Sequence, residues 1–418
     1  MAAGLVNYGS TNNTGEIVFK ENAPGFASVV ENAGMLTNQA KGTITNTGSF
    51  QNDIGAILTN AGAITDTGGI VNSGTFNNSG TYTAANGFIN LGTTNNTGQI
   101  VVSASSLVED FGTLTNSKGA QITNNGDFDT AKGLILTNAG TLTNNSTLTN
   151  GSFFTNSGVL NNTGSLQNLI SLQVASGGVV NNTLSGAIST TGLAGGALFA
   201  VLQGGTLNNT GSFTVDALSN FTMAAGSTVV NNATGQMTLS SSTLQVVVGG
   251  SLKNNGMINL AGSIDNTGFF LPPPTLVVAS TGTLSGTGFI TGAVSNFGTI
   301  RPGDLTGALT IFGLDQEMTG STLDIFLDGM NPGEFGQLDV NGDVVLGGTL
   351  DVALGAGFDP VSGEIFEIVS GKTSGAFADV ILPTLPAGLS FQLDQEANGV
   401  FLDVTGTATG GGNGGGSG

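Results

Sequence analysis

The sequence predicts an all-β fold, a parallel β-helix in which very short strands coil into stacked turns. The first observation is a six-residue phrase, in which Gly62, Gly68, Gly74 and Gly80 are each followed two residues later by an apolar side chain. The second is alternation, because the apolar position lies between small polar residues, as in a strand with one buried face. Six residues are too few for a helix and a turn, and one such strand cannot bury its apolar side chain alone. The phrases therefore have to stack as turns of a β-solenoid.

The corners between the predicted strands consist of glycine and of Asn or Asp, as at Asn60, Asp66, Asn72 and Asn78. We expect glycine and asparagine to turn the chain because both tolerate positive φ. Glycine reaches 70 of 418 residues without the regular spacing of collagen. Asparagine in NNT and NNS triplets is also predicted to stack on asparagine of the next turn, forming ladders of side-chain amides. The triplets begin at Asn12, Asn77, Asn95, Asn144, Asn161, Asn181 and Asn208.

A longer repeat indicates how many residues one turn takes. Ile44 and Ile122, and likewise Phe50 and Phe128, lie 78 residues apart within matching sequence. Coils of this kind commonly use roughly 20 to 25 residues per turn, so the duplicated block is predicted to span about three or four turns.

The composition divides the chain near residue 300. Sixteen of the 27 acidic residues follow Gly298, and the strands there become conventional alternating runs. We predict a Gly/Asn-rich β-solenoid over 1–300, and over 301–407 a C-terminal β module that caps the stack or serves in assembly. A flexible Gly-rich tail is predicted over 408–418.

Charge and composition exclude several classes of function. The chain has 7 basic residues against 27 acidic ones, a formal net charge of -20. This balance argues against nucleic-acid binding and against docking on anionic lipid, which both rely on Lys and Arg. Cysteine is absent, so no disulfide framework forms. No apolar run approaches the roughly 18 to 20 residues of a membrane span, and no signal peptide is visible at Met1.

Five phrases of the C-terminal part resemble a known family. They are GTIRPG at 298–303, GALTIFG at 307–313, LDVNGDVVLGGTLDV at 338–352, GFDPVSGEIFEIV at 357–369 and SGAFADV at 374–380. These phrases are similar to the C-terminal end of bacterial autotransporter passengers, and the repeats upstream resemble haemagglutinin-like β-solenoid surface proteins. The resemblance implies a right-handed parallel β-helix whose last module caps the stack. It also implies an extracellular or bacterial cell-surface location.

The candidate catalytic groups are carboxylates. The chain has no histidine, which excludes Ser-His-Asp triads and histidine metal sites. Asp127 and Asp129 would share one face of a strand, as paired acids do in solenoid polysaccharide hydrolases. The same pattern fits a polar outer face around a buried Phe128. A carbohydrate-active β-helix enzyme is therefore the alternative to a non-enzymatic protein.

A second group of oxygen-bearing residues has the spacing of a calcium loop. Asp339, Asn341 and Asp343 alternate along the chain, with Gly342 to help it turn. Leu350 stands at the twelfth position, where such a loop needs a Glu. The same residues fit a hairpin turn between two strands. Calcium is the one metal that the sequence suggests, and no other cofactor is expected.

The N-terminal turn is predicted to be an assembly edge. Repeat-like phrasing begins within the first five residues, which leaves little room for a cap. An uncapped turn exposes unpaired backbone N–H and C=O groups. We predict that Leu5, Val6, Ile17 and Val18 form this edge, which would pair with the C-terminal module of another copy, head to tail.

Together these observations predict a non-enzymatic extracellular structural protein. It would self-assemble head to tail into surface or matrix fibres, or act as a surface adhesin. Its predicted partners are other copies of itself or a carbohydrate or protein of a host or surface. Neither nucleic acid nor a membrane span is expected.

Overall fold

The structure is a computed structural model. It describes residues 5–20, 29–131, 135–192, 196–240, 243–246, 251–260, 275–278, 280, 282–303, 305–317 and 319–407. These residues form strands and no helix, so they contain no helix that is long and apolar enough to cross a membrane. Two compact units result, Met1–Val230 with Thr234–Ser241 and Asn231–Ala233 with Ser242–Gly418. The predicted tail at 408–418 lies outside the described residues.

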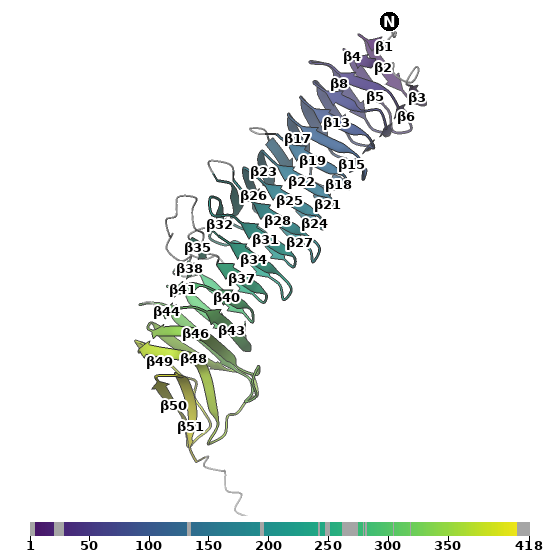
Figure 1. Ribbon diagram of the computed structural model, residues 1–418. Coiled ribbons are helices and arrows are strands. Elements are labelled where there is room, and N and C mark those ends of the chain that lie inside the picture. The colour runs from purple at the N-terminus through teal and green to yellow at the C-terminus, as the bar shows by residue number, and fades with distance from the viewer. Residues whose placement is uncertain are drawn as a thin grey trace, which may run out of the picture. The chain divides into compact units, whose positions relative to one another are not determined.

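In the first unit, each turn places one strand in each of three parallel sheets, as the purple to teal strands of Figure 1 show. Sheet A contains β1 Leu5–Asn7, β4 Val29–Asn32, β7 Ser49–Asn52, β10 Ile70–Asn72, β13 Gly87–Asn90, β16 Leu107–Asp110, β19 Asp127–Thr130, β22 Thr147–Asn150, β25 Ser165–Asn168, β28 Ala187–Thr190, β31 Ser212–Val215 and β34 Gln236–Leu239. Sheet B contains β2 Ser10–Asn13, β5 Met35–Asn38, β8 Ile57–Asn60, β11 Thr75–Asn78, β14 Thr93–Asn96, β17 Thr113–Asn116, β20 Ile135–Asn138, β23 Phe153–Asn156, β26 Ser171–Val174, β29 Leu198–Val201 and β32 Asn220–Met223. Sheet C contains β3 Glu16–Phe19, β6 Thr43–Asn46, β9 Ala63–Asp66, β12 Thr81–Ala84, β15 Gln99–Val102, β18 Gln121–Asn124, β21 Thr141–Asn144, β24 Val159–Asn162, β27 Val179–Asn182, β30 Thr206–Asn209 and β33 Thr228–Asn231. The predicted parallel β-solenoid is confirmed.

The predicted alternation sets the core of this unit. In most of the four-residue strands the second and fourth side chains are buried and the other two face outward. The second position is apolar in most strands, with Thr94 of β14 as a buried polar exception. Phe76, Tyr82 and Phe88 of successive strands meet edge to face, with ring centroids 5.2 to 6.0 Å apart. Burying one such ring contributes about 1.5 to 3 kcal/mol, so the stack of turns, and not any single strand, supplies the stability.

The structure corrects the reason for glycine at the corners. Positive φ was expected, yet Gly62, Gly68, Gly74 and Gly80 do not adopt it, and Gly69 is the residue of this stretch that does, with φ 105. A Cβ at any of the first four would lie under 3.0 Å from a carbonyl oxygen of the preceding turn. Glycine is therefore needed at these four positions because the backbones of successive turns approach closely there, whereas Gly55 and Gly119 at other corners adopt the expected positive φ.

The predicted stacking of asparagine is confirmed, and it forms a buried ladder. Side chains of the fourth strand position donate from Nδ2 to Oδ1 of the next turn at 2.8 Å. The ladder of sheet B runs through Asn38, Asn60, Asn78, Asn96 and Asn116. Four turns separate its first and last members, so the 78-residue repeat takes four turns.

Most asparagines that begin the NNT and NNS triplets are outward neighbours of the buried ladder residues, and not ladder residues themselves. Asn77 and Asn95 bond to each other at 3.0 Å on the outer face, and Asn181 bonds to Asn161 at 2.9 Å in the same way. In those triplets the buried rung is the following asparagine, such as Asn78. The sequence thus predicted the ladder, and the register decides which asparagine is inside.

A carboxylate interrupts the ladder of sheet A at Asp110. The side chain is 1% exposed, and its Oδ1 accepts from Asn90 Nδ2 at 2.7 Å, but its Oδ2 has no hydrogen-bond partner in the described structure. Burial raises the pKa of Asp110, against the opposing bonds from Asn90 and the Gly112 amide. Because the protonated form is favoured in the folded state, the stabilising effect of the proton is complete below the unfolded pKa and is lost as pH rises through the folded value.

We therefore expect Asp110→Asn to raise the Tm of the first unit by a few degrees at pH 7. The gain should shrink as the pH is lowered towards 3, because the native carboxyl then carries its proton. Thermal unfolding at pH 3, 5 and 7 measures this, with Asp129→Asn, at an outward position one turn on, as the matched control. A gain that is independent of pH would contradict the assignment to this carboxylate.

The second unit contains parallel ladders of its own, followed by antiparallel pairing near its C-terminal end. One ladder contains β35 Thr243–Val246, β38 Thr275–Val278, β41 Ala293–Asn296 and β44 Asp315–Glu317, and another contains β37 Met257–Leu260, β40 Phe289–Thr291 and β43 Gly307–Phe312. The third contains β36 Ser251–Asn254, β39 Thr283–Gly286, β42 Thr299–Pro302, β45 Thr322–Leu327, β47 Thr349–Leu354 and β49 Asp379–Ile381. The long strands β46 Gly336–Leu346 and β48 Ile365–Gly375 extend the first two ladders in parallel. Apart from an isolated antiparallel bridge between Leu327 and Phe335, the antiparallel pairing among the described residues involves β51 Gly399–Gly406, which joins β48 to β50 Leu389–Glu396.

The predicted division at residues 300 and 301 lies inside the second unit. There β42 pairs in parallel with β39 before it and with β45 after it. Arg301 on β42 donates from Nε to Asp324 of β45 at 2.8 Å, on the outward side of this ladder. The amino-acid composition therefore changes within a continuous parallel ladder. The change from parallel to antiparallel strand pairing comes later, at β48.

Candidate functional site

The first candidate site is the N-terminal turn, formed by β1, β2 and β3. Within the described residues each of these strands pairs on one side only, with β4, β5 and β6 respectively. Parallel strands elsewhere in the unit have neighbours on both sides, for example β11 between β8 and β14. The first turn thus presents a strand edge in all three sheets.

The register separates the four predicted edge residues into two pairs. Leu5 aligns with Val30 and Ile17 aligns with Ile44, and both of these partners are buried, whereas Val6 and Val18 align with the outward residues Glu31 and Thr45. Ile44 is buried, but Ile17 above it is only half-buried, and Val18 is 40% exposed. Ile17 is therefore the member of the set whose side chain faces the open end of the core.

A cavity of about 250 Å³ lies at this turn. Its apolar lining includes Ile17, Phe19, Leu36 and Phe50, and the rings of Phe19 and Phe50 stack with centroids 5.6 Å apart. Thr11 occupies the column that holds Leu36 one turn on, so the first turn fills its core less completely than the next. The cavity offers space for an apolar side chain from outside.

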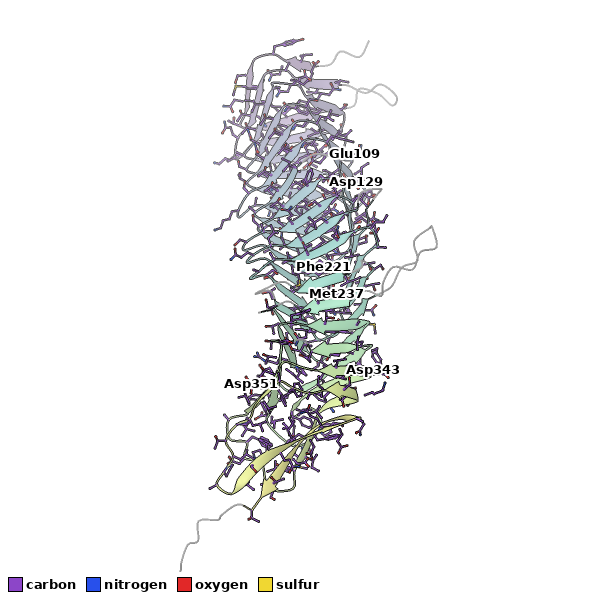
Figure 2. All side chains as sticks on the ribbon, turned by 90° about the vertical axis from the view of Figure 1, so that its left-hand side faces the viewer. Glu109, Asp129, Phe221, Met237, Asp343 and Asp351 are labelled. Atoms are coloured by element: carbon purple, nitrogen blue, oxygen red, sulfur yellow. The ribbon has the colours of Figure 1, made fainter. Side chains whose placement is uncertain are left out.

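The second candidate site is the acidic outer face of sheet A. Asp127 and Asp129 flank the buried Phe128 on β19, with Asp127 exposed and Asp129 half-buried. The register places Glu109 of β16 directly beside Asp129, and Figure 2 shows these two residues on the same flank. Glu109 escaped the sequence reasoning because the 20-residue offset between these turns is visible only once the strands are aligned. Three carboxylates thus share an outward face, which fits both interpretations of the pair.

The third candidate, the predicted calcium loop, is a strand. Asp339, Asn341 and Asp343 all lie on β46, where the register against β48 shifts between the two acids. The alternative prediction of a hairpin turn is wrong, because these residues lie within one continuous strand whose parallel pairing with β48 includes both Asp339 and Asp343. Asp339 Oδ1 accepts from Ser370 Oγ at 2.5 Å, and Asp343 Oδ1 accepts from Lys372 Nζ at 2.8 Å. Calcium binding by the three residues stays a prediction.

Two buried acids of the second unit were not predicted. Asp315 and Glu317 occupy inward positions of β44, and Asp315 aligns with the core residue Val344. Glu317 is 4% exposed; its Oε2 accepts from Asn296 Nδ2 and from Ser321 Oγ at 2.7 Å, and its Oε1 has no hydrogen-bond partner in the described structure. Burial raises the pKa of Glu317 to about 7, although the bonds from Ser321 and Asn296 oppose the rise.

Comparisons with known proteins add little to this geometry. No protein-family model matches the sequence, and no curated protein matches it. Among solved structures, the chain is similar to a TibC-catalyzed hyper-glycosylated TibA55-350 fragment, with 15% identity over 84% of this chain and 98% of that one, at a TM-score of 0.26. A TM-score this low supports no inference, so the fold assignment rests on the strand register described above.

Proposed function

We propose that this chain is a non-enzymatic structural protein outside the bacterial cell, which acts as a surface adhesin. The observation that carries the proposal is an uncharged polar stripe on the outward side of sheet B, in which the third strand positions of successive turns align in register. Its members are Thr37, Thr59, Asn77, Asn95, Thr115, Thr137, Thr155 and Gln173.

The stripe supports adhesion through its chemistry and its spacing. Each hydroxyl or amide can both donate and accept a hydrogen bond, and neighbouring strands repeat at about 4.8 Å. A partner with many neutral polar groups, such as a glycan, would meet a row of similar contacts, each worth little alone and more in series. The resemblance of the C-terminal phrases to autotransporter passengers supports the proposed location outside the bacterial cell.

Charge placed in the stripe should abolish adhesion. We expect the double variant Thr115→Lys and Thr137→Lys to reduce binding of protein-coated beads to bacterial and host cell surfaces at least tenfold. The matched control is Thr123→Lys with Thr143→Lys, at outward positions of neighbouring turns in sheet C. Bead counts after washing, together with a glycan array, measure the effect. Equal binding by both double variants would refute the stripe as the adhesive face.

A second candidate function, assembly into fibres, has its own observation. The strand edges and the cavity of the first turn are suited to adding a further parallel turn. Repetition of one heterologous contact builds an open filament. We propose this assembly as the second role of the chain, alongside adhesion.

A further inference from the structure

The first turn carries glycine at two corners where nothing in the described structure requires it. A Cβ added at Gly9 or Gly15 would meet no atom within 4 Å. In later turns the glycines of the same two columns, such as Gly34 and Gly80, would place a Cβ under 3.0 Å from a carbonyl oxygen of the preceding turn. Glycine at these corners therefore leaves room for a turn stacked on the N-terminal side. Gly9 and Gly15 give the first turn the same room, although no described turn occupies it.

An amide oxygen of the first turn also lacks a donor that the same position has further along. Asn90 Oδ1 accepts from Thr94 Oγ1 at 3.0 Å and from Asn72 Nδ2, one turn before, at 2.8 Å. Asn7 Oδ1 accepts the equivalent bond from Thr11 Oγ1 at 3.1 Å and, among the described residues, no amide donor from a preceding turn. Asn13 of β2 and Asn96 of β14 differ in the same way. Both Oδ1 atoms accept from a backbone N–H two residues on, but Asn96 also accepts from Asn78 Nδ2 of the preceding turn, and Asn13 has no such donor among the described residues.

The ladders give this edge a direction. Every buried amide bond described above runs from Nδ2 of one turn to Oδ1 of the turn that follows in the chain. For the side-chain amides, the N-terminal face of the first turn is consequently an acceptor face, whereas its corners present backbone N–H groups, because Ala33 N and Met35 N of the next turn donate towards the first turn. Two such faces brought together would oppose amide oxygen to amide oxygen and N–H to N–H, so the geometry disfavours a head-to-head contact and favours a partner that complements both kinds of group.

In the second unit, β49 is the last strand of its parallel ladder and carries a matching inward column. Within the described residues β49 pairs with β47 only. Val380 aligns with the buried Leu350 and is itself half-buried, while Ile381 faces outward and is 49% exposed. Val380 and Ile17 are thus the half-exposed end members of two inward apolar columns.

We propose that the N-terminal face of the first turn docks β49 of a second copy, head to tail. This inference rests on the fibre assembly proposed above and names its contact. β49 of one copy lies parallel to β3 of the next, Val380 covers Ile17 at the cavity, and Ile381 lies beside Val18 on the outside. Because each copy carries a net charge of -20, the contact strengthens as salt screens the repulsion between copies.

Gly15→Ala tests the contact without disturbing the fold. In sedimentation velocity across a concentration series in 0.5 M NaCl, we expect the 418-residue protein to form lengthening head-to-tail chains. The alanine Cβ should collide with the incoming backbone and weaken association at least tenfold, while Tm stays unchanged. Thr14→Ala, at the exposed neighbouring position, should assemble normally. A wild-type protein that stays monomeric, or undiminished assembly of Gly15→Ala, would overturn the proposal and leave the bead assay of the sheet B stripe unaffected.

Cross-linking tests the direction. The chain has no cysteine, and paired positions on adjacent strands lie within reach of a disulfide. We expect a protein carrying both Val18→Cys and Ile381→Cys to form covalent multimers under mild oxidation, whereas each single variant stays monomeric on non-reducing gels. Covalent dimers of the Val18→Cys variant alone would show a head-to-head contact and overturn the proposal.

Discussion

Replacing Gly80 by alanine is expected to destabilise the first unit by about 3 kcal/mol, or roughly 6 to 12 °C in Tm. The added Cβ would lie under 3.0 Å from the carbonyl oxygen of Gly62 and from the backbone of Ala61. That carbonyl accepts a ladder bond from Thr81 N at 2.9 Å, so it cannot withdraw without weakening the contact between the two turns. Thermal unfolding followed by circular dichroism at pH 7 measures the loss.

The matched control for this substitution is Gly15→Ala in the same column. Among the described residues, no atom lies within 4 Å of the new Cβ there, so we expect a change within about 0.5 kcal/mol. The contrast separates close approach from any intrinsic difference between glycine and alanine. If Gly80→Ala proved as stable as the wild type, the corners would tolerate separation of the turns, and the explanation of the glycine repeat would fail.

The sequence was sufficient to predict the β-solenoid. It was insufficient to predict why Gly62, Gly68, Gly74 and Gly80 have to be glycine. Period and alternation around Gly62 and Gly80 predict strands of the observed phase, because both are properties of neighbouring residues. The crowding that demands glycine arises between residues 18 apart in the chain. It exists only in the stack, whereas the local sequence shows only the tolerance of glycine for positive φ.

The same limit explains the edge residues. Alternation required Ile17 and Val18 to face opposite ways, but it did not say which one faces the core. The alignment of Ile17 with Ile44 decides this. The prediction therefore grouped together residues that the stack treats differently.

The inward positions of Asp315 and Glu317 could not be predicted from the sequence, because the neighbouring Leu314 suggests the opposite phase of the strand. In the run Leu314 to Glu317, hydrophobicity alone would place Leu314 inside and Asp315 outside. The structure does the reverse, with Leu314 40% exposed and Asp315 buried. β44 lies between β41 and β46, and the alignment of Asp315 with Val294 and Val344 sets its phase. Register with neighbouring strands overrides local hydrophobicity there, at the cost of buried carboxyl groups.

Glu317→Gln is expected to remove most of the pH dependence in the stability of β44 and its neighbours. The folded pKa of Glu317, about 7, lies above the ordinary value of 4.5. A group whose pKa rises on folding contributes stability that is complete below its unfolded pKa and is lost as pH rises through the folded value. A shift of this size corresponds to about 3 kcal/mol, so the native protein should hold this region more firmly at pH 4.5 than at pH 8.

The charges around Glu317 make the substitution specific. Asp315 is the acid that shares its inward face, while Arg301, Asp324 and Asp343 on neighbouring strands lie at outward positions. Hydrogen exchange of the β41 and β44 amides at pH 4.5, 6, 7 and 8, corrected for intrinsic rates, measures the local stability. Asp351→Asn, at an outward position of β47, should keep the native pH profile. A native profile that is flat, or that rises towards pH 8, would mean that Glu317 is ionised in the folded core and that its neighbours compensate the charge.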